Sequence, residues 1–311
     1  MKIVLPEHMP VLNDTHMAAL KKFGEVIAFP DFPANDDEIV RRIGNAEILV
    51  TKWEKISDNI MRRCPAVQYI VTLSVGINAI DVEAAARRGV KVINCPTHSA
   101  LSVAEHAIGL MFAVSRNFYT SQKMLADGKW KPDLESFCGV ELAGKRLGII
   151  GGGLIGKRLA SLADVLGMEA YYADIETPKH DVDVMIATSD YVSLNIPYSP
   201  ETHHYIDERR LGLMKKTAYL INTSRGAIVD QEALIYVLKK GKIAGAALDV
   251  FEGEPLFGEI SDEIRELASL PNVVATPHIG YNTKEANKRL AEELIANVKA
   301  IVTGSPINVK N

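Results

Sequence analysis

Residues 146–162 read RLGIIGGGLIGKRLASL, and this stretch decides the fold of the second half of the chain. Gly151, Gly153 and Gly156 form a G-x-G-x-x-G pattern directly after an apolar strand and directly before a helical segment. The first glycine allows a tight turn, the second lets the backbone approach a pyrophosphate, and the third lets helix and strand pack closely. The pyrophosphate would then lie at a helix N-terminus, which favours anions. The pattern predicts a dinucleotide-binding unit.

An acidic residue at the end of the next strand narrows the choice of dinucleotide. The strand EAYYAD (169–174) ends in Asp174, whose carboxylate would accept hydrogen bonds from the adenosine ribose hydroxyls and repel a 2′-phosphate. The following residues, IETPKH, contain no arginine that would attract such a phosphate. The sequence therefore predicts NAD as the cofactor in preference to NADP.

The alternation of strands and helices extends over the whole chain. Amphipathic segments such as 81–89, 155–167 and 230–241 lie between short runs rich in Val, Ile and Leu. This alternation predicts an α/β protein with parallel sheets covered by helices on both faces. The expected strands are 2–5, 25–29, 47–51, 67–73, 91–95, 146–150, 169–174, 191–196, 218–223, 244–250 and 272–276.

The strands divide into groups of five and six on either side of an apolar segment. Residues 101–126 are apolar nearly all round, as expected of a helix buried between domains or against a second subunit. A last helix near 283–303 follows the second group, and the most economical layout returns it to the first domain. We expect two doubly wound domains: a flavodoxin-like one of 1–99 plus 283–311, and a Rossmann domain of 100–282.

The composition excludes several classes of protein. The 311 residues are 47% hydrophobic and carry a formal net charge of −4 with no block of Lys or Arg, so no nucleic-acid-binding surface is expected. Apolar runs such as 107–114 are far shorter than the roughly twenty residues that span a bilayer. The start, MKIVLPEHMP, is broken by Pro and Glu and does not resemble a secretion signal. A cytoplasmic protein without disulfide or metal site is expected from the spacing of Cys64, Cys95 and Cys138.

Polar residues follow three strands of the second domain. Arg225 follows AYLINTS, Asp249 and Glu254 lie in ALDVFEGEP, and His278 follows NVVATP. Ligands of open α/β sheets bind in the crevice outside the carboxyl ends of the strands. Considered singly, Arg225 could form a salt bridge within its loop, Glu254 could be a charge on the surface, and His278 could make contacts only within its turn. Together they suit one reaction.

That reaction is the reduction of a 2-oxo acid by hydride transfer. The substrate carboxylate needs a planar, permanently charged partner, which Arg225 supplies better than a lysine would. The carbonyl oxygen gains negative charge as hydride arrives, and His278 has a suitable pKa for donating a proton there. Glu254 is the natural carboxylate partner that holds the tautomer of this histidine.

At these residues the chain resembles the D-isomer-specific 2-hydroxyacid dehydrogenase family, in particular its glyoxylate and hydroxypyruvate reductases. The resemblance covers most of the chain after residue 65. The segments that carry it are VGINAID (75–81), INCPTHSALSVAEHAIGL (93–110), GIIGGGLIG (148–156), NIPYSPET (195–202), MKKTAYLINTSRGAIVDQEAL (214–234), ALDVFEGEP (247–255) and TPHIG (276–280).

The resemblance implies a homodimer built around residues 101–145 that interconverts a small 2-oxo acid and its D-2-hydroxy acid. It implies Arg225, Glu254 and His278 as the catalytic residues, with the backbone of Val75 and Gly76 helping Arg225 and His278 to bind the substrate. Glyoxylate, hydroxypyruvate and short alkyl 2-oxo acids all fit. The implied cofactor-binding residues are Gly151, Gly153, Leu154, Ile155, Gly156, Asp174, Asn195, Ile196, Pro197, Thr202, Thr223, Ser224, Asp249 and Gly280.

The chain departs from the family in two places. The segment ETPKHDVDVMIATS (176–189) is short for the family, so a more open adenine pocket is expected. The first 65 residues match only as a pattern, and there Lys52 and Trp53 are candidates for selecting the substrate side chain, with local packing as the alternative for Trp53. Trp130 lies in a segment that in some relatives reaches the neighbouring subunit's site.

Two other functions remain open on this fold. One is oxidation of phosphite or formate, although formate-specific relatives carry Gln in place of Glu254. The other is an NAD-sensing binding protein similar to a transcriptional corepressor. Such a protein would be distinguished by an exposed peptide groove or a long disordered tail, and no such tail is evident.

Overall fold

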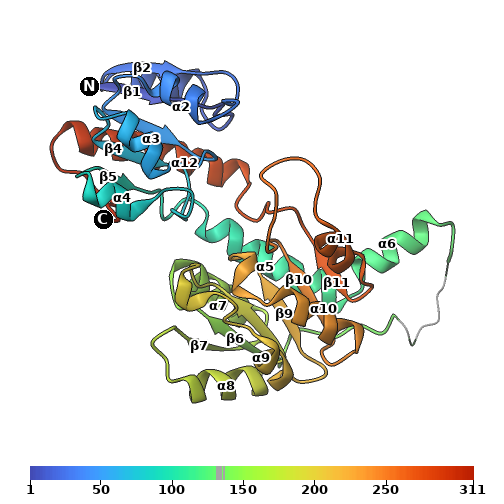
Figure 1. Ribbon diagram of the computed structural model, residues 1–311. Coiled ribbons are helices and arrows are strands. Elements are labelled where there is room, and N and C mark those ends of the chain that lie inside the picture. The colour runs from blue at the N-terminus through green and yellow to red at the C-terminus, as the bar shows by residue number, and fades with distance from the viewer. Residues whose placement is uncertain (131–134, 136) are drawn as a thin grey trace. The chain divides into compact units, whose positions relative to one another are not determined.

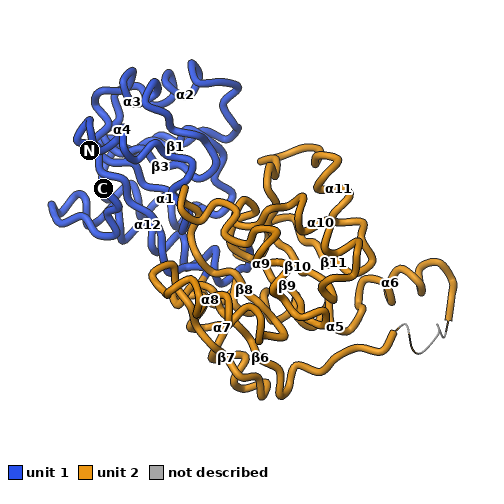
Figure 2. The backbone as a smooth tube through the Cα atoms, turned by 60° about the horizontal axis from the view of Figure 1, so that its bottom comes forward, with its two compact units in different colours: residues 1–99, 282–311 blue, residues 100–281 orange. Residues whose placement is uncertain are grey.

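The chain folds into two compact units, each built on its own parallel sheet. The computed structural model describes residues 1–130, 135 and 137–311. Unit 1 comprises residues 1–99 and 282–311, and unit 2 comprises residues 100–281 (Figure 2). Each strand lies within a range expected from the sequence. The expected fold class, two parallel-sheet α/β domains, is confirmed.

Unit 1 contains a five-stranded parallel sheet of order β2-β1-β3-β4-β5. The order reverses between β1 and β3, which is the doubly wound arrangement of flavodoxin-like sheets. Its strands are β1 (Lys2–Leu5), β2 (Glu25–Ala28), β3 (Ile48–Thr51), β4 (Tyr69–Thr72) and β5 (Lys91–Ile93). Its helices are α1 (Asp14–Leu20), α2 (Asp36–Ile43), α3 (Asp58–Arg63), α4 (Val82–Arg87) and α12 (Lys284–Val302).

The strands of unit 1 bury both faces. Successive side chains of a strand point to opposite faces, so neighbouring residues enter different cores. Val4 packs with helices α2, α3 and α4, whereas Ile3 and Leu5 pack with α1 and α12. The Thr283 side chain caps α12 by accepting the Ala286 N–H at 3.1 Å. The last helix therefore covers one face of the sheet formed by the first 99 residues, which explains why unit 1 is discontinuous.

Unit 2 contains a six-stranded parallel sheet of order β11-β10-β9-β8-β6-β7 (Figure 1). Its strands are β6 (Arg146–Ile150), β7 (Glu169–Ala173), β8 (Tyr191–Leu194), β9 (Tyr219–Asn222), β10 (Gly245–Leu248) and β11 (Val273–Ala275). Its helices are α5 (Ala100–Ser115), α6 (Phe118–Ala126), α7 (Leu154–Val165), α8 (Lys179–Thr188), α9 (Glu208–Leu213), α10 (Gln231–Lys239) and α11 (Asp262–Ser269), with 3-10 turns η1 (Pro200–Thr202) and η2 (Gly226–Ile228).

The chain order of unit 2 reverses between β6 and β8. A crevice forms outside the carboxyl ends of the strands at such a switch point, and ligands bind there. Helices cover both faces of the sheet: Ile149 packs in a core with α5 and α7, whereas Ile150 packs in a core with α8, α9, α10 and α11. The short segment after Asp174 forms α8, and β7 is an edge strand.

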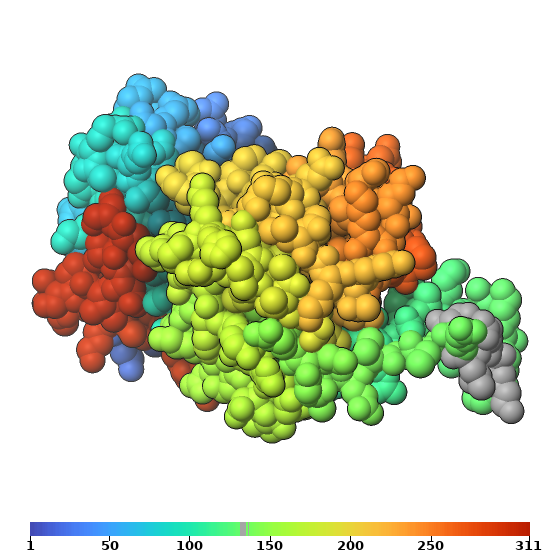
Figure 3. Space-filling model, turned by 90° about the horizontal axis from the view of Figure 1, so that it is seen from below, coloured from blue at the N-terminus to red at the C-terminus, as the bar shows by residue number. Residues whose placement is uncertain are grey.

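The apolar segment 101–126 forms two helices. α5 buries eight of its side chains, whereas none of the side chains of α6 is buried. The break lies at Asn117, which adopts a left-handed conformation with φ +56°. Figures 1 and 3 show α6 standing away from the body of unit 2. None of the helices in the described residues has the length and apolar character needed to cross a membrane.

Candidate active site

The glycines after β6 have different steric environments. A Cβ atom at Gly151, where φ is +109°, would lie 2.4 Å from the carbonyl oxygen of Asn195, the residue that follows β8. A Cβ at Gly156 would lie 2.0 Å from the carbonyl oxygen of Gly151. A Cβ at Gly153 would meet no atom within 4 Å. Packing thus requires the first and third glycines, whereas the second borders open space at the switch point.

Helix α7 begins at this open space. Gly153 is its N-cap, and no side chain caps the helix within the described residues. The N–H groups of its first turn are therefore available to an anion such as a pyrophosphate. Leu154 is 54% exposed and Ile155 is half-buried at the start of the helix. Asp174, exposed at the end of β7, accepts a hydrogen bond from the Gly152 N–H at 3.0 Å and so lies beside the glycine turn.

The loop after β8 is held by its own hydrogen bonds. Thr202 Oγ1 donates to the carbonyl oxygen of Pro197 at 2.9 Å and accepts the Ser199 N–H at 2.7 Å. Thr202 is buried, as is Ile196. These contacts fix a loop that begins at the switch point.

Two buried polar atoms near the switch point fit a bound dinucleotide. Asn195 Oδ1 follows β8 and Thr223 Oγ1 follows β9, and neither has a hydrogen-bond partner among the described residues. Leaving a buried polar atom unpaired costs about 1–3 kcal/mol, so a ligand that supplies donors there is favoured. Next to Thr223, the Ser224 hydroxyl donates to the Leu194 carbonyl at 2.7 Å and joins the two loops. The residues present therefore fit the expected cofactor.

His278 and Glu254 form a close pair at the carboxyl edge of the sheet. His278 Nδ1 lies 2.6 Å from Glu254 Oε1, and Glu254 Oε2 accepts the Phe251 N–H at 3.0 Å. The carboxylate therefore accepts a hydrogen bond from the Nδ1–H and leaves Nε2 available on the other side of the ring. The side chains are 39% and 31% exposed, so both partners are accessible.

Asp249 organises the loop that carries His278. Its Oδ1 accepts the Thr276 hydroxyl at 2.6 Å and the Ile279 N–H at 2.9 Å, and its Oδ2 accepts the Gly280 N–H at 2.8 Å. The His278 N–H donates to the Asp249 carbonyl at 2.8 Å. His278 itself adopts the left-handed region with φ +52°, which is uncommon for a residue other than glycine. One carboxylate and its backbone thus determine the unusual turn that presents the imidazole.

The charge of Asp249 is maintained in this buried position. Burial alone would raise its pKa, but hydrogen bonds from His106, Thr276 and the backbone N–H groups outweigh burial and lower the pKa. His106 Nε2 lies 3.0 Å from Thr276 Oγ1 and 3.4 Å from Asp249 Oδ1. Because the Thr276 hydroxyl donates to Asp249, it accepts from His106. Sequence reasoning missed His106 and Thr276, since their side chains meet across 170 positions of the chain.

Arg225 lies in the loop after β9, next to the loop that carries Glu254. A Cβ at Gly226 would lie 1.8 Å from the carbonyl carbon of Phe251, so the two loops touch through their backbones. The Arg225 Nη1 donates to the Ser224 carbonyl at 2.7 Å. Burial lowers the pKa of Arg225, and the Glu254 carboxylate opposes that shift. The guanidinium is therefore near enough to Glu254 to interact electrostatically.

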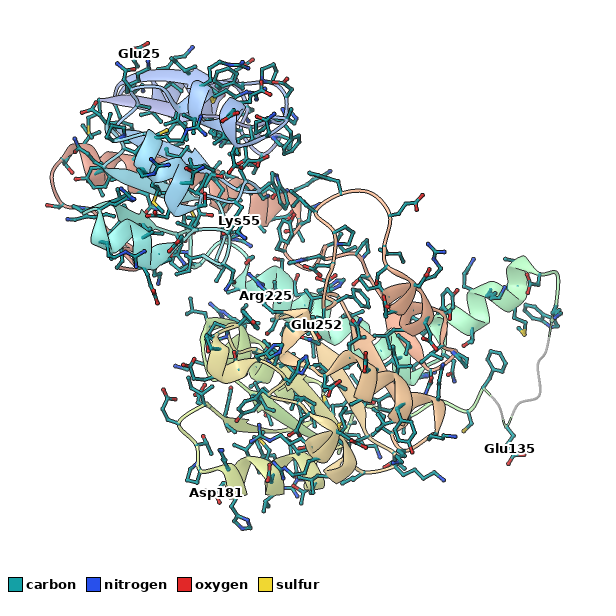
Figure 4. The ribbon with its side chains drawn as sticks, in the orientation of Figure 1. Glu25, Lys55, Glu135, Asp181, Arg225 and Glu252 are labelled. Carbon is teal, nitrogen blue, oxygen red and sulfur yellow. The ribbon has the colours of Figure 1, made fainter. Side chains whose placement is uncertain are left out.

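A hydrogen-bonded pair that sequence reasoning missed joins the loops at the same edge. His204 Nε2 lies 2.9 Å from Glu252 Oε2, and the His204 N–H donates to the Ala227 carbonyl at 2.9 Å. The loop after β8 is thereby joined to the loops after β9 and β10. Figure 4 shows Glu252 and Arg225 at this edge of unit 2.

Val75 and Gly76 follow β4 at the carboxyl edge of the unit 1 sheet. Their carbonyl oxygens accept hydrogen bonds from Asn94 Nδ2, at 2.7 Å, and from the Ser74 hydroxyl, respectively. Neither of their N–H groups has an acceptor among the described residues. These N–H groups are suited to binding a carboxylate.

The whole chain is similar to known dehydrogenases. The family model described as "D-isomer specific 2-hydroxyacid dehydrogenase, NAD binding domain" matches residues 108–280. The chain is 38% identical to the glyoxylate reductase of Thermofilum pendens, over 94% of this chain and 90% of that protein.

Solved structures with the same fold contain either form of the cofactor. An acyclic imino acid reductase in complex with NADPH and D-Arg has a TM-score of 0.91 at 29% identity, and each chain is covered completely. D-lactate dehydrogenase from Aquifex aeolicus, complexed with NAD and lactic acid, has a TM-score of 0.85 at 30% identity, covering 98% of this chain and 96% of that one.

The fold and the glycine turn define an oxidoreductase with a Rossmann NAD-binding domain. The chain belongs to the D-isomer specific 2-hydroxyacid dehydrogenase family.

Two glycine substitutions separate packing from cofactor binding. Gly156→Ala should lower the free energy of unfolding by about 1–3 kcal/mol, because its Cβ collides with the Gly151 carbonyl. Gly153→Ala should leave stability within about 0.5 kcal/mol but weaken NADH binding at least tenfold, because its Cβ occupies the space for the pyrophosphate. Denaturant titration and NADH fluorescence measure the two effects. Equal NADH affinity in Gly153→Ala and wild type would show that the pyrophosphate binds elsewhere.

Proposed function

We propose that this chain reduces a small 2-oxo acid to the D-2-hydroxy acid with NADH, and oxidises the hydroxy acid in reverse. The 2.6 Å contact between His278 Nδ1 and Glu254 Oε1 carries the proposal. The contact leaves His278 Nε2 available at the carboxyl edge of the unit 2 sheet. The glycine turn at the same edge suits a dinucleotide. The family of the chain supports the same class of reaction.

Each catalytic side chain has a distinct part in the proposal. When bound, the cofactor supplies the hydride. Arg225 holds the substrate carboxylate by a two-pronged interaction that a lysine cannot make. His278 donates a proton from Nε2 to the carbonyl oxygen, and Glu254 holds Nδ1 and stabilises the charged imidazole. Because Asp249 fixes the loop around His278, little reorganisation is needed as charge develops.

Unit 1 is the substrate domain in this proposal. The N–H groups of Val75 and Gly76 would bind the substrate carboxylate together with Arg225. Carboxylates are bound well by converging backbone N–H groups, and these two are unpaired within the described residues. The boundaries expected from the sequence, 1–99 plus 283–311 and 100–282, then separate substrate binding from NAD binding.

The adenosine side of the cofactor would be bound by the loop after β8. Asn195, Ile196, Pro197 and Thr202 form this loop, and its hydrogen bonds hold it in place. The nicotinamide side would be surrounded by Thr223, Ser224, Asp249 and Gly280.

The polypeptide is also proposed to be a cytoplasmic homodimer that uses residues 101–145 as its interface. Phe118, Tyr119 and Leu125 on α6 are 47–56% exposed, which is costly for large apolar side chains unless another surface covers them. Cys64, Cys95 and Cys138 are free, as expected in a reducing compartment.

Light scattering should give about twice the mass of the chain, and Phe118→Asp should halve the measured mass. Val184→Asp, which alters an exposed side chain of α8, is the control.

Removal of the imidazole tests the proposed reaction. His278→Ala should lower kcat for glyoxylate or hydroxypyruvate by about 10²–10⁴-fold, because general acid catalysis contributes that much. The NADH dissociation constant should stay within threefold. The same assays with His180→Ala, an exposed histidine of α8, control for loss of a histidine elsewhere. Turnover of His278→Ala at the wild-type rate would refute the assignment, and activity with only phosphite or formate would identify a different substrate class.

Replacement of Asp174 tests the preference for NAD. Asp174→Ala should reduce the ratio of kcat/KM for NADH over NADPH at least tenfold, because the carboxylate both binds the ribose hydroxyls and repels the 2′-phosphate. Glu176→Ala removes a nearby exposed charge and should leave the ratio unchanged. An unaltered ratio in Asp174→Ala would mean that another residue distinguishes the cofactors.

A further inference from the structure

We propose that His203, His204 and Glu252 form a binding site for one divalent transition-metal ion such as Zn²⁺, and that the ion fastens the loop after β8 to the loop after β10. All three residues belong to unit 2, and their ligand atoms lie within 4.8 Å of one another. Among the described residues, no other group of three His, Cys, Asp or Glu side chains comes together in this way. The inference does not depend on which substrate the active site reduces.

The backbone of the loop after β8 brings two consecutive histidine rings to the same side. In an extended chain, consecutive side chains point to opposite sides. His203 is extended, with φ −61° and ψ 127°, but His204 adopts the left-handed region with φ +48°. With this change of conformation the two imidazole rings lie face to face, with centroids 3.9 Å apart and an interplanar angle of 23°. Two rings that share one side can bind the same ion.

The conformation of His204 is maintained by bonds to a neighbouring loop. A left-handed backbone is uncommon for a residue other than glycine. The His204 N–H donates to the Ala227 carbonyl at 2.9 Å, and the Ile206 N–H donates to the Ile228 carbonyl at 3.0 Å. Both acceptors lie in the turn η2 after β9. Backbone strain that the surrounding structure maintains in this way is concentrated at ligand sites.

The third ligand comes from the loop after β10. Glu252 Oε2 lies 2.9 Å from His204 Nε2, so the ring donates a hydrogen bond to the carboxylate. The Glu252 N–H donates to Gln231 Oε1 at 3.2 Å, which holds the backbone of Glu252 against the start of α10. The imidazole and the carboxylate are therefore preorganised, although they belong to different loops. An ion bound by both joins those loops more strongly than one hydrogen bond does.

The donor set selects the kind of ion. Two imidazole nitrogens and one carboxylate oxygen suit Zn²⁺, Co²⁺ or Ni²⁺, whereas Mg²⁺ and Ca²⁺ prefer oxygen ligands alone. Ligands at about 2.0–2.1 Å from a tetrahedral zinc ion lie about 3.3 Å from one another. His204 and Glu252 are already close to that spacing. The exposed side chain of His203 can close the remaining gap by rotating about its own bonds.

The site is accessible, and the histidine can exchange its hydrogen bond for a metal bond. The side chains of His204 and Glu252 are each 35% exposed, so an ion can enter from the solvent. It takes the place of the hydrogen on His204 Nε2, which the neutral ring can carry on Nδ1 instead. Water can fill the fourth position of a tetrahedral ion.

Titration of the metal-free chain with ZnCl₂ tests the proposal. After treatment with EDTA and dialysis, the wild type should bind one Zn²⁺ with a dissociation constant of about 10 μM or below, measured by isothermal titration calorimetry. His203→Asn should weaken this binding at least tenfold, because it removes one of three ligands. His180→Asn, the same substitution at an exposed histidine of α8, is the matched control and should keep the wild-type affinity.

Glu252→Gln distinguishes a link between loops from a site made by the two histidines alone. Glutamine still accepts the hydrogen bond from His204 Nε2, so the loops keep their contact, but a neutral amide is a poor zinc ligand. Zinc affinity should fall at least tenfold in this variant also. If Glu252→Gln keeps the affinity that His203→Asn loses, the ion does not join the loops and the proposal is refuted.

Thermal unfolding measures the fastening of the loops. A ligand that binds only the folded chain stabilises it, so Zn²⁺ at ten times its dissociation constant should raise the unfolding temperature of the wild type by about 3 °C or more. The same concentration of Zn²⁺ should raise that of Glu252→Gln by less than about 1 °C, and Mg²⁺ should have no effect on either protein. Absence of zinc binding, equal affinity in the wild type and both ligand variants, or binding without a rise in unfolding temperature would each overturn the proposal.

Discussion

The buried carboxylate of Asp249 is the constraint on which the catalytic edge depends. It accepts hydrogen bonds from the Thr276 hydroxyl and from the N–H groups of Ile279 and Gly280. Between them lies His278, in a left-handed conformation that an isolated chain would rarely adopt. The hydrogen bonds to Asp249 stabilise that turn. The turn in turn brings the imidazole within 2.6 Å of Glu254. The position of the proposed proton donor thus follows from one buried charge, and its tautomer follows from the contact with Glu254.

The same principle organises unit 1. There the Glu7 carboxylate accepts N–H groups of the turn after β3 and fixes Lys52, as Asp249 fixes the turn after β11 in unit 2. In both sheets a carboxylate near the carboxyl ends of the strands satisfies donors of an adjacent loop. A buried charge is costly unless such hydrogen bonds surround it, so each carboxylate specifies one conformation of its loop.

Sequence periodicity predicted the strands and both sheets because Val-, Ile- and Leu-rich runs need two covered faces. Helix α12 was predicted from its place after the last strand. The break between α5 and α6 was not predicted, because it lies at Asn117, where no glycine or proline stands in the sequence. The chemistry of the reaction indicated Glu254 as the partner of His278. It gave no indication of His106 or Thr276, whose roles come from contacts across 170 positions.

The most direct test of this account is the turnover of Asp249→Asn, with wild type as reference, in reduction of glyoxylate by NADH at saturating concentrations. The amide has nearly the same shape but replaces one acceptor oxygen with a donor, which faces donors of the 276–280 loop. The account predicts a folded protein, by circular dichroism, whose kcat is at least 100-fold lower. A kcat equal to that of the wild type would show that the carboxylate does not position His278.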